Sequence, residues 1–302
     1  MTSDQPKTRS SNAPKGLLGL LASARRLREA TPAPLRRFLR RFINRDRYLQ
    51  NLWLAQDPYR DVEEISTYPA RVDVRLGIIR EFTHAHKDYI GACRELGVPY
   101  RLIDISTADW IERIEQSDCD AFLVRPSARN TLWKQLYEEL LRVMAHDMCK
   151  IIYPTYDEIW FYESKRRMHD WLTVHNIPHP RTWVFYDLDE ALAFAGSAPL
   201  PLVFKMDLGS GGSGVRILRK RSEAMKLVRR IFRKGIVRRD GDALDRQWGN
   251  VLFQEYLPGV KEWRVLRLGD SFFAHQKLPL GDFHSGSGQV AWLDPPCELL
   301  DF

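Results

Sequence analysis

The sequence contains few cysteines, and none of them are grouped in pairs. Its four cysteines, Cys93, Cys119, Cys149 and Cys297, are scattered along 302 residues. This distribution argues against a disulfide-framed domain and against a zinc site built from paired cysteines, and it favours a reducing compartment. The sequence also lacks an H-E-x-x-H motif, which disfavours a metalloprotease-like centre. We therefore predict no metal ligands among the cysteines and histidines.

Long hydrophobic runs are also missing. The longest candidate, residues 17–24, is interrupted by Gly19 and followed by Arg25 and Arg26. A helix that spans a bilayer needs about 20 apolar residues, so this segment is too short. We expect a cytoplasmic protein, with peripheral membrane contact left open by the charge pattern described next.

Positive charge is concentrated at the N-terminus. The first 50 residues hold twelve Lys or Arg against three acidic residues, a net charge of +9, whereas the whole chain carries +7. Hydrophobic residues make up 44% of the sequence and charged residues 28%, which is typical of a globular chain with a sizeable core. The basic character therefore belongs to an extension, for which we expect the bounds 1–70, and not to the body.

Within this extension, residues 34–47 have the pattern of a cationic amphipathic helix. Apolar residues recur at helical spacing at Leu35, Phe38, Leu39, Phe42 and Ile43, and arginines occupy the other face. Such a helix can lie on an anionic membrane surface. It can equally pack against the body with a solvated basic face. The sequence leaves both interpretations open, and it does not determine the oligomeric state.

Residues 71–155 alternate between predicted strands and helices. Strands are expected at 74–79, 100–105, 121–124 and 150–153, and helices at 85–96, 108–116 and 130–148. Alternating units of this kind predict a mostly parallel sheet with right-handed crossovers. No G-x-G-x-x-G follows the first strand, so the domain carries no dinucleotide fingerprint.

Residues 156–302 change to a pattern that favours antiparallel sheets. We expect a helix at 162–175, strands at 182–185, 202–205, 215–218, 251–257, 263–268 and 271–277, and helices at 188–195 and 222–233. The second of these two helices is rich in basic residues, and Phe232 is its single aromatic residue. We therefore interpret it as a solvated face and expect no nucleic-acid partner.

A glycine-rich loop between two predicted strands is the first feature that points to chemistry. Its residues are Gly209, Ser210, Gly211, Gly212, Ser213 and Gly214. Such a loop can present backbone N–H groups to a phosphate, although a flexible turn has the same composition. It is not a Walker loop, because no Gly-Lys-Ser or Gly-Lys-Thr follows it. Lys205 ends the apolar strand before the loop, where a buried ammonium needs a negative partner.

In their order and spacing, these segments and others resemble the ATP-grasp superfamily, in particular its carboxylate–amine ligase branch, which includes glutathione synthetase and the ribosomal-protein glutamate ligase. The resemblance begins near Val72. The segments that carry it are the α/β domain, Glu163-Ser164-Lys165, Ile177-Pro178-His179-Pro180-Arg181-Thr182, Val203-Phe204-Lys205 with its loop, Gln254-Glu255-Tyr256-Leu257 and Glu262-Trp263-Arg264-Val265. The resemblance implies a parallel pre-ATP-grasp domain at 71–155 and an ATP-grasp domain at 156–302.

By this resemblance the chain binds ATP and activates a carboxylate as an acyl phosphate, which an amine then attacks. Lys165 and Lys205 would contact the phosphates, and the loop 209–214 would close over them. Glu255 with the backbone of Tyr256 and Leu257 would bind adenine, and Glu262 would bind ribose. Lys277 or His284, the latter in a loop at 281–288, would occupy the place that an arginine usually holds near the γ-phosphate. On position alone, Lys165 also fits a solvated helix and His284 an ordinary loop.

No residues up to the last segment, 299–302, match the acidic residues that bind Mg²⁺ in the family. ATP and Mg²⁺ are the cofactors that the resemblance implies. Mg²⁺ normally offsets the charge of the transferred phosphates, so a chain without its ligands would transfer them poorly. We therefore expect an ATP-grasp domain that is incomplete at its C-terminus. The alternative is a catalytically degenerate nucleotide-binding or scaffolding protein. The carboxylate and amine substrates are not identified by the sequence.

Overall fold

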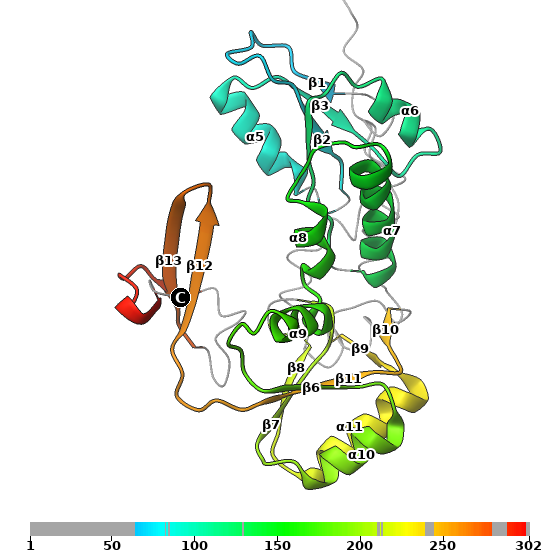
Figure 1. The fold of residues 1–302 in the computed structure, drawn as a ribbon, viewed down its shortest axis with the longest axis vertical. Helices are drawn as coiled ribbons and strands as arrows, with labels where there is room; N and C mark the ends of the chain where they lie inside the picture. Colours follow the sequence, from blue (N-terminus) through cyan, green and yellow to red (C-terminus); the bar gives the residue numbers. More distant parts are fainter. Residues whose placement is uncertain are drawn as a thin grey trace, which may run out of the picture. The chain divides into compact units, whose positions relative to one another are not determined.

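The computed structural model describes residues 64–299, except residues 82, 84, 129, 210–211, 213, 239–244 and 280–288 (Figure 1). The predicted amphipathic helix at 34–47 lies outside the described residues, as do Ser210, Gly211, Ser213 and His284. No helix in the described part of the chain is long and apolar enough to cross a membrane.

The first half of the described chain forms a five-stranded sheet in the order β1-β3-β2-β4-β5. Its strands are β1 (Glu64–Ile65), β2 (Leu76–Ile79), β3 (Tyr100–Ile103), β4 (Ala121–Leu123) and β5 (Ile152–Tyr153). β2 to β5 run parallel to their neighbours, and β1 joins the edge antiparallel to β3. The predicted parallel α/β architecture is therefore confirmed, with β1 as an addition.

Helices cover both faces of this sheet, as a parallel sheet requires. The helices are α5 (His86–Leu96), α6 (Trp110–Glu115) and α7 (Thr131–Arg142), which continues into a π-helical turn at Val143–Asp147. Consecutive residues of β2 point to opposite sides: Ile78 packs in a cluster with Ile90 of α5, whereas Ile79 packs in a cluster with Tyr137 of α7. This alternation places one core on each side of the sheet.

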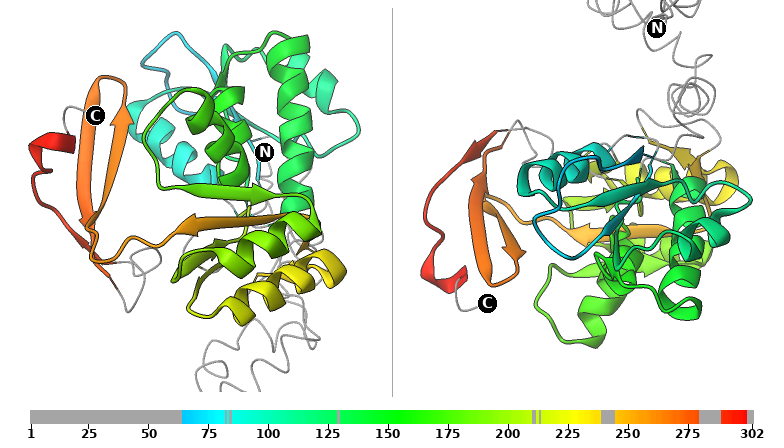
Figure 2. Two further views of the ribbon diagram at one scale, coloured as in Figure 1. Left: turned by 60° about the horizontal axis from the view of Figure 1, so that its bottom comes forward. Right: turned by 90° about the horizontal axis from the view of Figure 1, so that it is seen from above.

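The second half is built on a four-stranded antiparallel sheet in the order β6-β11-β7-β8. Its strands are β6 (Thr182–Phe185), β7 (Leu202–Lys205), β8 (Val215–Leu218) and β11 (Val251–Glu255). Two helices, α10 (Leu188–Ser197) and α11 (Arg221–Lys234), lie side by side against one face (Figure 2). The core between them contains Phe204 and Phe253. The predicted antiparallel architecture is confirmed.

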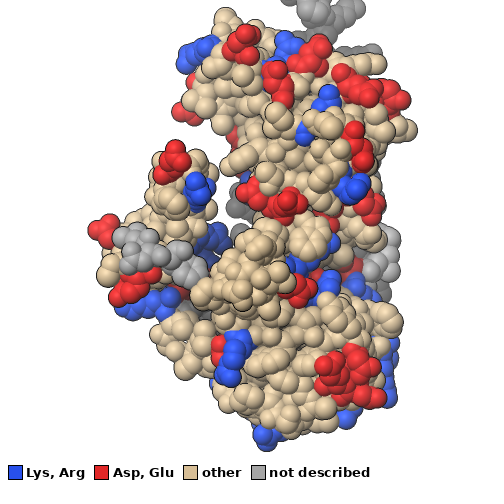
Figure 3. Space-filling view, in the orientation of Figure 1, with Lys and Arg blue, Asp and Glu red and all other residues tan. Residues whose placement is uncertain are grey.

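Smaller elements complete the described chain. β12 (Glu262–Leu268), β13 (Ser271–Lys277) and β14 (Val290–Ala291) form a three-stranded antiparallel sheet, followed by a short 3-10 turn at Cys297–Leu299. β9 (Ile236–Val237) and β10 (Arg246–Gln247) form a short hairpin that the sequence pattern did not predict. On the face drawn in Figure 3, Lys, Arg, Asp and Glu side chains of the described residues are interspersed.

The helix predicted at 162–175 corresponds to α9 (Lys165–Val174), which begins three residues later than predicted. A separate helix that was not predicted, α8 (Tyr156–Phe161), precedes it. A capping box begins α8: the Thr155 side chain accepts the Glu158 N–H, and the Glu158 carboxylate accepts the Thr155 N–H at 2.7 Å. Glu163, at φ +59°, then breaks the helical path. The break places Lys165 in the first turn of α9.

Candidate functional site

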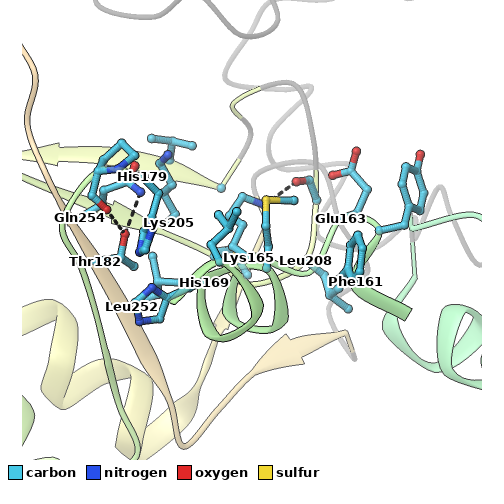
Figure 4. A pocket seen from close by; sticks show the side chains of 18 of the residues that line it. Phe161, Glu163, Lys165, His169, His179, Thr182, Lys205, Leu208, Leu252 and Gln254 are labelled. Atoms are coloured by element: carbon cyan, nitrogen blue, oxygen red, sulfur yellow. Dashed lines mark hydrogen bonds between the residues drawn. The ribbon is translucent and has the colours of Figure 1, made fainter. Parts of the chain in front are cut away.

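A cavity of about 680 Å³ lies over the face of the four-stranded sheet that α10 and α11 leave open. Strand alternation decides which side chains line it. Phe204 and Phe253 point into the core with the helices, whereas Lys205, Leu252 and Gln254 line the cavity. Two strands far apart in sequence supply these three residues, since Leu252 of β11 pairs with Lys205 of β7. α9 and the residues before it contribute another wall, which includes Lys165, His169 and Glu163 (Figure 4).

Lys205 and Lys165 are two of the cations that line the cavity, together with Arg264 and Lys277. Lys205 and Lys165 are partly buried, and this burial lowers the pKa of each ammonium, because desolvation disfavours the charged form. Nearby carboxylates act in the opposite direction: Glu262 for Lys205, and Glu163 and Asp207 for Lys165. The two ammonium groups are therefore positioned to gain from an anionic ligand.

The glycine loop lies beside Lys165. The Lys165 Nζ donates hydrogen bonds to the backbone carbonyls of Gly209 at 2.6 Å and Asp207 at 3.2 Å. Gly209 and Gly212 have φ values of +122° and +73°, a region that side-chain-bearing residues rarely adopt, and both line the cavity together with Gly214. The structure thus brings both predicted lysines and three of the predicted loop residues to one cavity.

Asp207 joins α9 to the loop. Its carboxylate accepts hydrogen bonds from Ser164 Oγ at 3.0 Å, the Arg166 backbone N–H at 3.0 Å and Arg166 Nε at 2.9 Å. Its own N–H donates to Gln247 Oε1 at 2.8 Å. A carboxylate at the first turn of a helix satisfies N–H groups that have no intrahelical partner. These contacts fix the position of Lys165 against the strand that ends in Lys205.

Lys277 also lines the cavity, from β13. Its ammonium forms an ion pair with Glu262, its register partner on β12. Glu262, the predicted ribose ligand, is not among the residues that line the cavity. In this structure the carboxylate is instead engaged by Lys277.

The residues predicted to bind adenine lie next to the cavity lining but do not form it. Glu255 accepts hydrogen bonds from the Arg181 N–H at 2.7 Å and from Arg181 Nε at 2.8 Å, and these bonds lower the pKa of its carboxyl group. Glu255 follows Gln254, so strand alternation turns the two side chains to opposite faces of the sheet. Tyr256 and Leu257 likewise do not line the cavity.

Several lining residues were missed by the sequence analysis, notably Gln254, Thr182, His169 and His179. Gln254 Nε2 donates to Thr182 Oγ1 at 2.9 Å, and Thr182 Oγ1 donates to the Pro180 carbonyl at 2.8 Å. The rings of His169 and His179 meet edge to face at 5.4 Å, and burial together with His179 lowers the pKa of His169. Period-two alternation along β11 was the available signal for Gln254.

Residues that suit a magnesium ion are few. Glu158 and Glu163 are the two carboxylates that line the cavity within the described chain. Across residues 64–299, with the gaps given above, no group of three or more His, Cys, Asp or Glu side chains could hold a metal ion. The described residues therefore fit a phosphate-bearing ligand better than they fit a resident cation.

Comparisons with known proteins identify the fold. No protein-family model and no curated protein matches the sequence. The structure is similar to a RimK-domain ATP-grasp protein from Sphaerobacter thermophilus, with a TM-score of 0.52 and 17% identity over 75% of this chain and 78% of that one. It is also similar to a D-alanine–D-alanine ligase from Bacillus anthracis in complex with ATP, with a TM-score of 0.51 and 16% identity over 76% and 73% of the two chains. The described chain has an ATP-grasp fold.

Proposed function

We propose that this protein binds ATP in the cavity and uses it to join a carboxylate to an amine. The observation that carries the proposal is the meeting of two partly buried lysines, Lys165 and Lys205, with a glycine loop at one side of a 680 Å³ cavity. Desolvated ammonium groups favour a ligand that brings negative charge, and triphosphate oxygens supply it. The ATP-grasp fold supports the same ligand, since one of the similar structures is a complex with ATP.

The proposed reaction has two steps. A carboxylate oxygen of the substrate attacks the γ-phosphorus of ATP, the bond to the β–γ bridging oxygen breaks, and ADP leaves. The amine nitrogen then attacks the carbonyl carbon of the acyl phosphate, loses a proton, and inorganic phosphate leaves. In both steps negative charge develops on phosphate oxygens, and positioned ammonium groups stabilise it.

In this proposal each residue keeps the role that the family resemblance implies. Lys165, Lys205 and the loop 209–214 hold the phosphates, and Lys277 or His284 stands near the transferred group. Lys277 would reach a phosphate by leaving Glu262, its partner in the free protein. Release of Lys277 also frees the Glu262 carboxylate for ribose hydroxyls. Breaking this one ion pair would therefore make Lys277 available to a phosphate and Glu262 available to the ribose.

Adenine would lie at the end of β11, near Glu255 and the backbone of Tyr256 and Leu257. Support for this placement comes from position, because these residues follow the lining residue Gln254 directly. Mg²⁺ normally accompanies ATP and offsets phosphate charge. The described residues form no site for it, and no step above depends on the ion.

A second candidate function is nucleotide binding without catalysis. The pairing of Lys277 with Glu262 favours it, since this pairing withdraws a cation from the cavity. The two candidates predict the same binding and differ only in turnover. An assay that measures binding and turnover on one preparation therefore separates them.

The test is a calorimetric titration of the full chain with ATP in the presence of Mg²⁺, followed by an ADP-release assay against a panel of amino acids and carboxylic acids. Lys205→Ala is expected to weaken ATP binding about ten- to a hundredfold, the effect of losing one charge-assisted bond of roughly 1.5–3 kcal/mol. Lys220→Ala is the matched control, because Lys220 is exposed at the start of α11, away from the lining. Equal affinities of the two variants would refute the assignment. ATP binding without ADP release on any substrate pair would favour the second candidate.

A further inference from the structure

The outer face of α11 carries a regular row of positive charge. The residues of α11 that pack into the core recur at helical spacing, and they are Ala224, Leu227, Val228 and Ile231. Four exposed cations repeat the same spacing on the opposite side of the helix, and we call them the basic stripe: Lys226, Arg229, Arg230 and Arg233. Since α10 and α11 cover one face of the four-stranded sheet and the cavity lies over the other face, the basic stripe is directed away from the cavity.

The basic stripe forms no ion pair with the described residues. Across residues 64–299, with the gaps given above, no carboxylate is paired with any of its four members. Residues 216–238 contain ten Lys or Arg against a single acidic residue, Glu223. The body beyond residue 50 is nevertheless slightly acidic as a whole, since the chain carries +7 and its first 50 residues carry +9. Positive charge in the body is therefore concentrated at α11 and beside it.

Grouping these cations works against the stability of α11. Lys226 and Arg230 are four positions apart, as are Arg229 and Arg233, and like charges at this spacing repel each other across one helical turn. Arg216 of β8 adds to the group, because desolvation together with the charge of Arg230 lowers the pKa of its guanidinium. An anionic surface relieves this repulsion on contact, so the arrangement favours an anionic partner.

An exposed tryptophan is held at the C-terminal end of α11. Trp248 is 64% exposed, and its indole N–H donates to the Phe232 carbonyl at 2.8 Å. Because this bond uses the one polar group of the indole, the ring presents apolar surface to a partner. Phe232 precedes Arg233 in the chain, so the tryptophan lies at the end of the basic stripe. An indole beside cations is typical of the interface between a bilayer and water, where the ring reaches the apolar boundary and the cations meet the headgroups.

We propose that the basic stripe and Trp248 dock this domain on an anionic bilayer. The cations meet phosphate and carboxylate groups of the lipid headgroups, and the indole enters the layer between the headgroups and the acyl chains. The predicted cationic amphipathic helix at 34–47 suits the same surface, and two contacts on one chain bind more tightly than either contact alone. Docking through α11 leaves the cavity accessible, because the sheet separates the cavity from the helix.

Co-sedimentation of the full chain with vesicles tests this surface. Vesicles of phosphatidylcholine with about one third phosphatidylserine are compared with vesicles of phosphatidylcholine alone. Arg229→Gln combined with Arg233→Gln should weaken binding to the anionic vesicles about 25-fold, or about fivefold for each charge removed. Lys87→Gln combined with Lys261→Gln is the matched control, because it removes the same charge from exposed positions outside α11 and should weaken binding by less than about threefold. Binding of the unmodified chain should be lost above about 0.5 M salt, where the screening length falls to about 4 Å.

Trp248→Ala separates a bilayer from other anionic partners. It should weaken binding to the anionic vesicles severalfold and leave any binding to duplex DNA or poly-glutamate unchanged, because only a bilayer offers an apolar layer to the ring. Thermal unfolding checks that each variant is folded. The variant without Arg229 and Arg233 should unfold at no lower temperature than the unmodified chain, since it loses repulsion between like charges.

Three results would overturn the inference. The first is that the unmodified chain does not bind the anionic vesicles. The second is that the α11 variant loses no more vesicle binding than the control variant, which would show that net charge alone drives binding. The third is that the α11 variant loses binding to duplex DNA or poly-glutamate while its binding to vesicles persists. None of these measurements involves ATP, so the proposed function is tested separately.

Discussion

Replacing Asp207 tests whether its contacts, which connect α9 to the glycine loop, stabilise the fold around the site. Asp207→Ala removes a carboxylate whose side chain is 13% exposed and which pairs with Arg166, itself 27% exposed. It also removes the acceptor of the buried Ser164 hydroxyl and of the Arg166 backbone N–H. Breaking a largely buried ion pair from one side typically costs 3–5 kcal/mol, and the partial exposure of Arg166 places this case at about 3 kcal/mol.

For a chain of this size, a loss of about 3 kcal/mol lowers Tm by about 6–12 °C. Differential scanning calorimetry measures this shift. Asp207→Asn, which keeps an oxygen for Ser164 but loses the charge, should lie between Asp207→Ala and the unmodified chain.

The matched control is Asp88→Ala, which removes another Asp–Arg pair. Asp88 is 78% exposed and bonds to Arg125 at 3.2 Å, so its loss should cost less than about 1 kcal/mol. If Asp207→Ala lowers Tm no more than Asp88→Ala does, then the Asp207 contacts do not stabilise the fold and the reasoning is wrong.

Two further predictions concern proton linkage and sheet packing. Since burial lowers the pKa of Lys165 and Lys205 below the ordinary value of 10.5, ATP binding should take up protons, and affinity should fall as pH rises toward 10.5. Over the same pH window the ligand-free protein should gain stability, because these lysines bind more protons in the unfolded chain than in the folded protein. Calorimetry in buffers of different ionisation enthalpy measures the proton uptake on ATP binding, and thermal scans at pH 8–10.5 measure the stability. An ATP affinity that does not change with pH would contradict the assignment. Gly77→Ala should cost about 1–3 kcal/mol, since its Cβ would lie 2.3 Å from Phe122 Cδ1. Phe122→Leu should then cost less in the Gly77→Ala background than alone, and strictly additive urea-unfolding free energies would rule out the clash.

The strands were the most predictable part of the fold. The predicted bounds 182–185, 202–205, 215–218 and 271–277 coincide with β6, β7, β8 and β13. These segments are short, β-prone runs bounded by turn residues, so their signal is local. β1 and the β9–β10 hairpin pair over two residues each and carry no comparable pattern. Only the tertiary structure defines them.

The helix break before Lys165 shows a local signal that was present but not used. Thr155 and Glu158 have the spacing of a capping box, which predicts a helix start at Tyr156. The positive φ of Glu163 has no such signature, because a non-glycine residue gives little warning of that conformation. The start of α8 could therefore have been predicted, and its end could not.

In the candidate site, the sequence identified residues that belong to compact motifs. Lys205 and the glycine loop are neighbours along the chain, so their association needs no knowledge of the fold. Gln254 and Thr182 meet only because β11 pairs with β6 across 72 positions. Asp207 likewise acts on Ser164 from 43 positions away. Contacts of this range depend on strand register, which the sequence alone does not fix.

The bonds of Lys165 to the carbonyls of Gly209 and Asp207 have a kinetic consequence. An ammonium has three N–H donors, and the carbonyls engage two of them, so among the described residues one donor is left for a phosphate oxygen. A phosphate bound there would share one cation with the backbone at Gly209. Ligand binding and the position of Gly209 are thereby coupled, and a stopped-flow trace of Lys165→Ala would differ from that of the unmodified chain in the association phase.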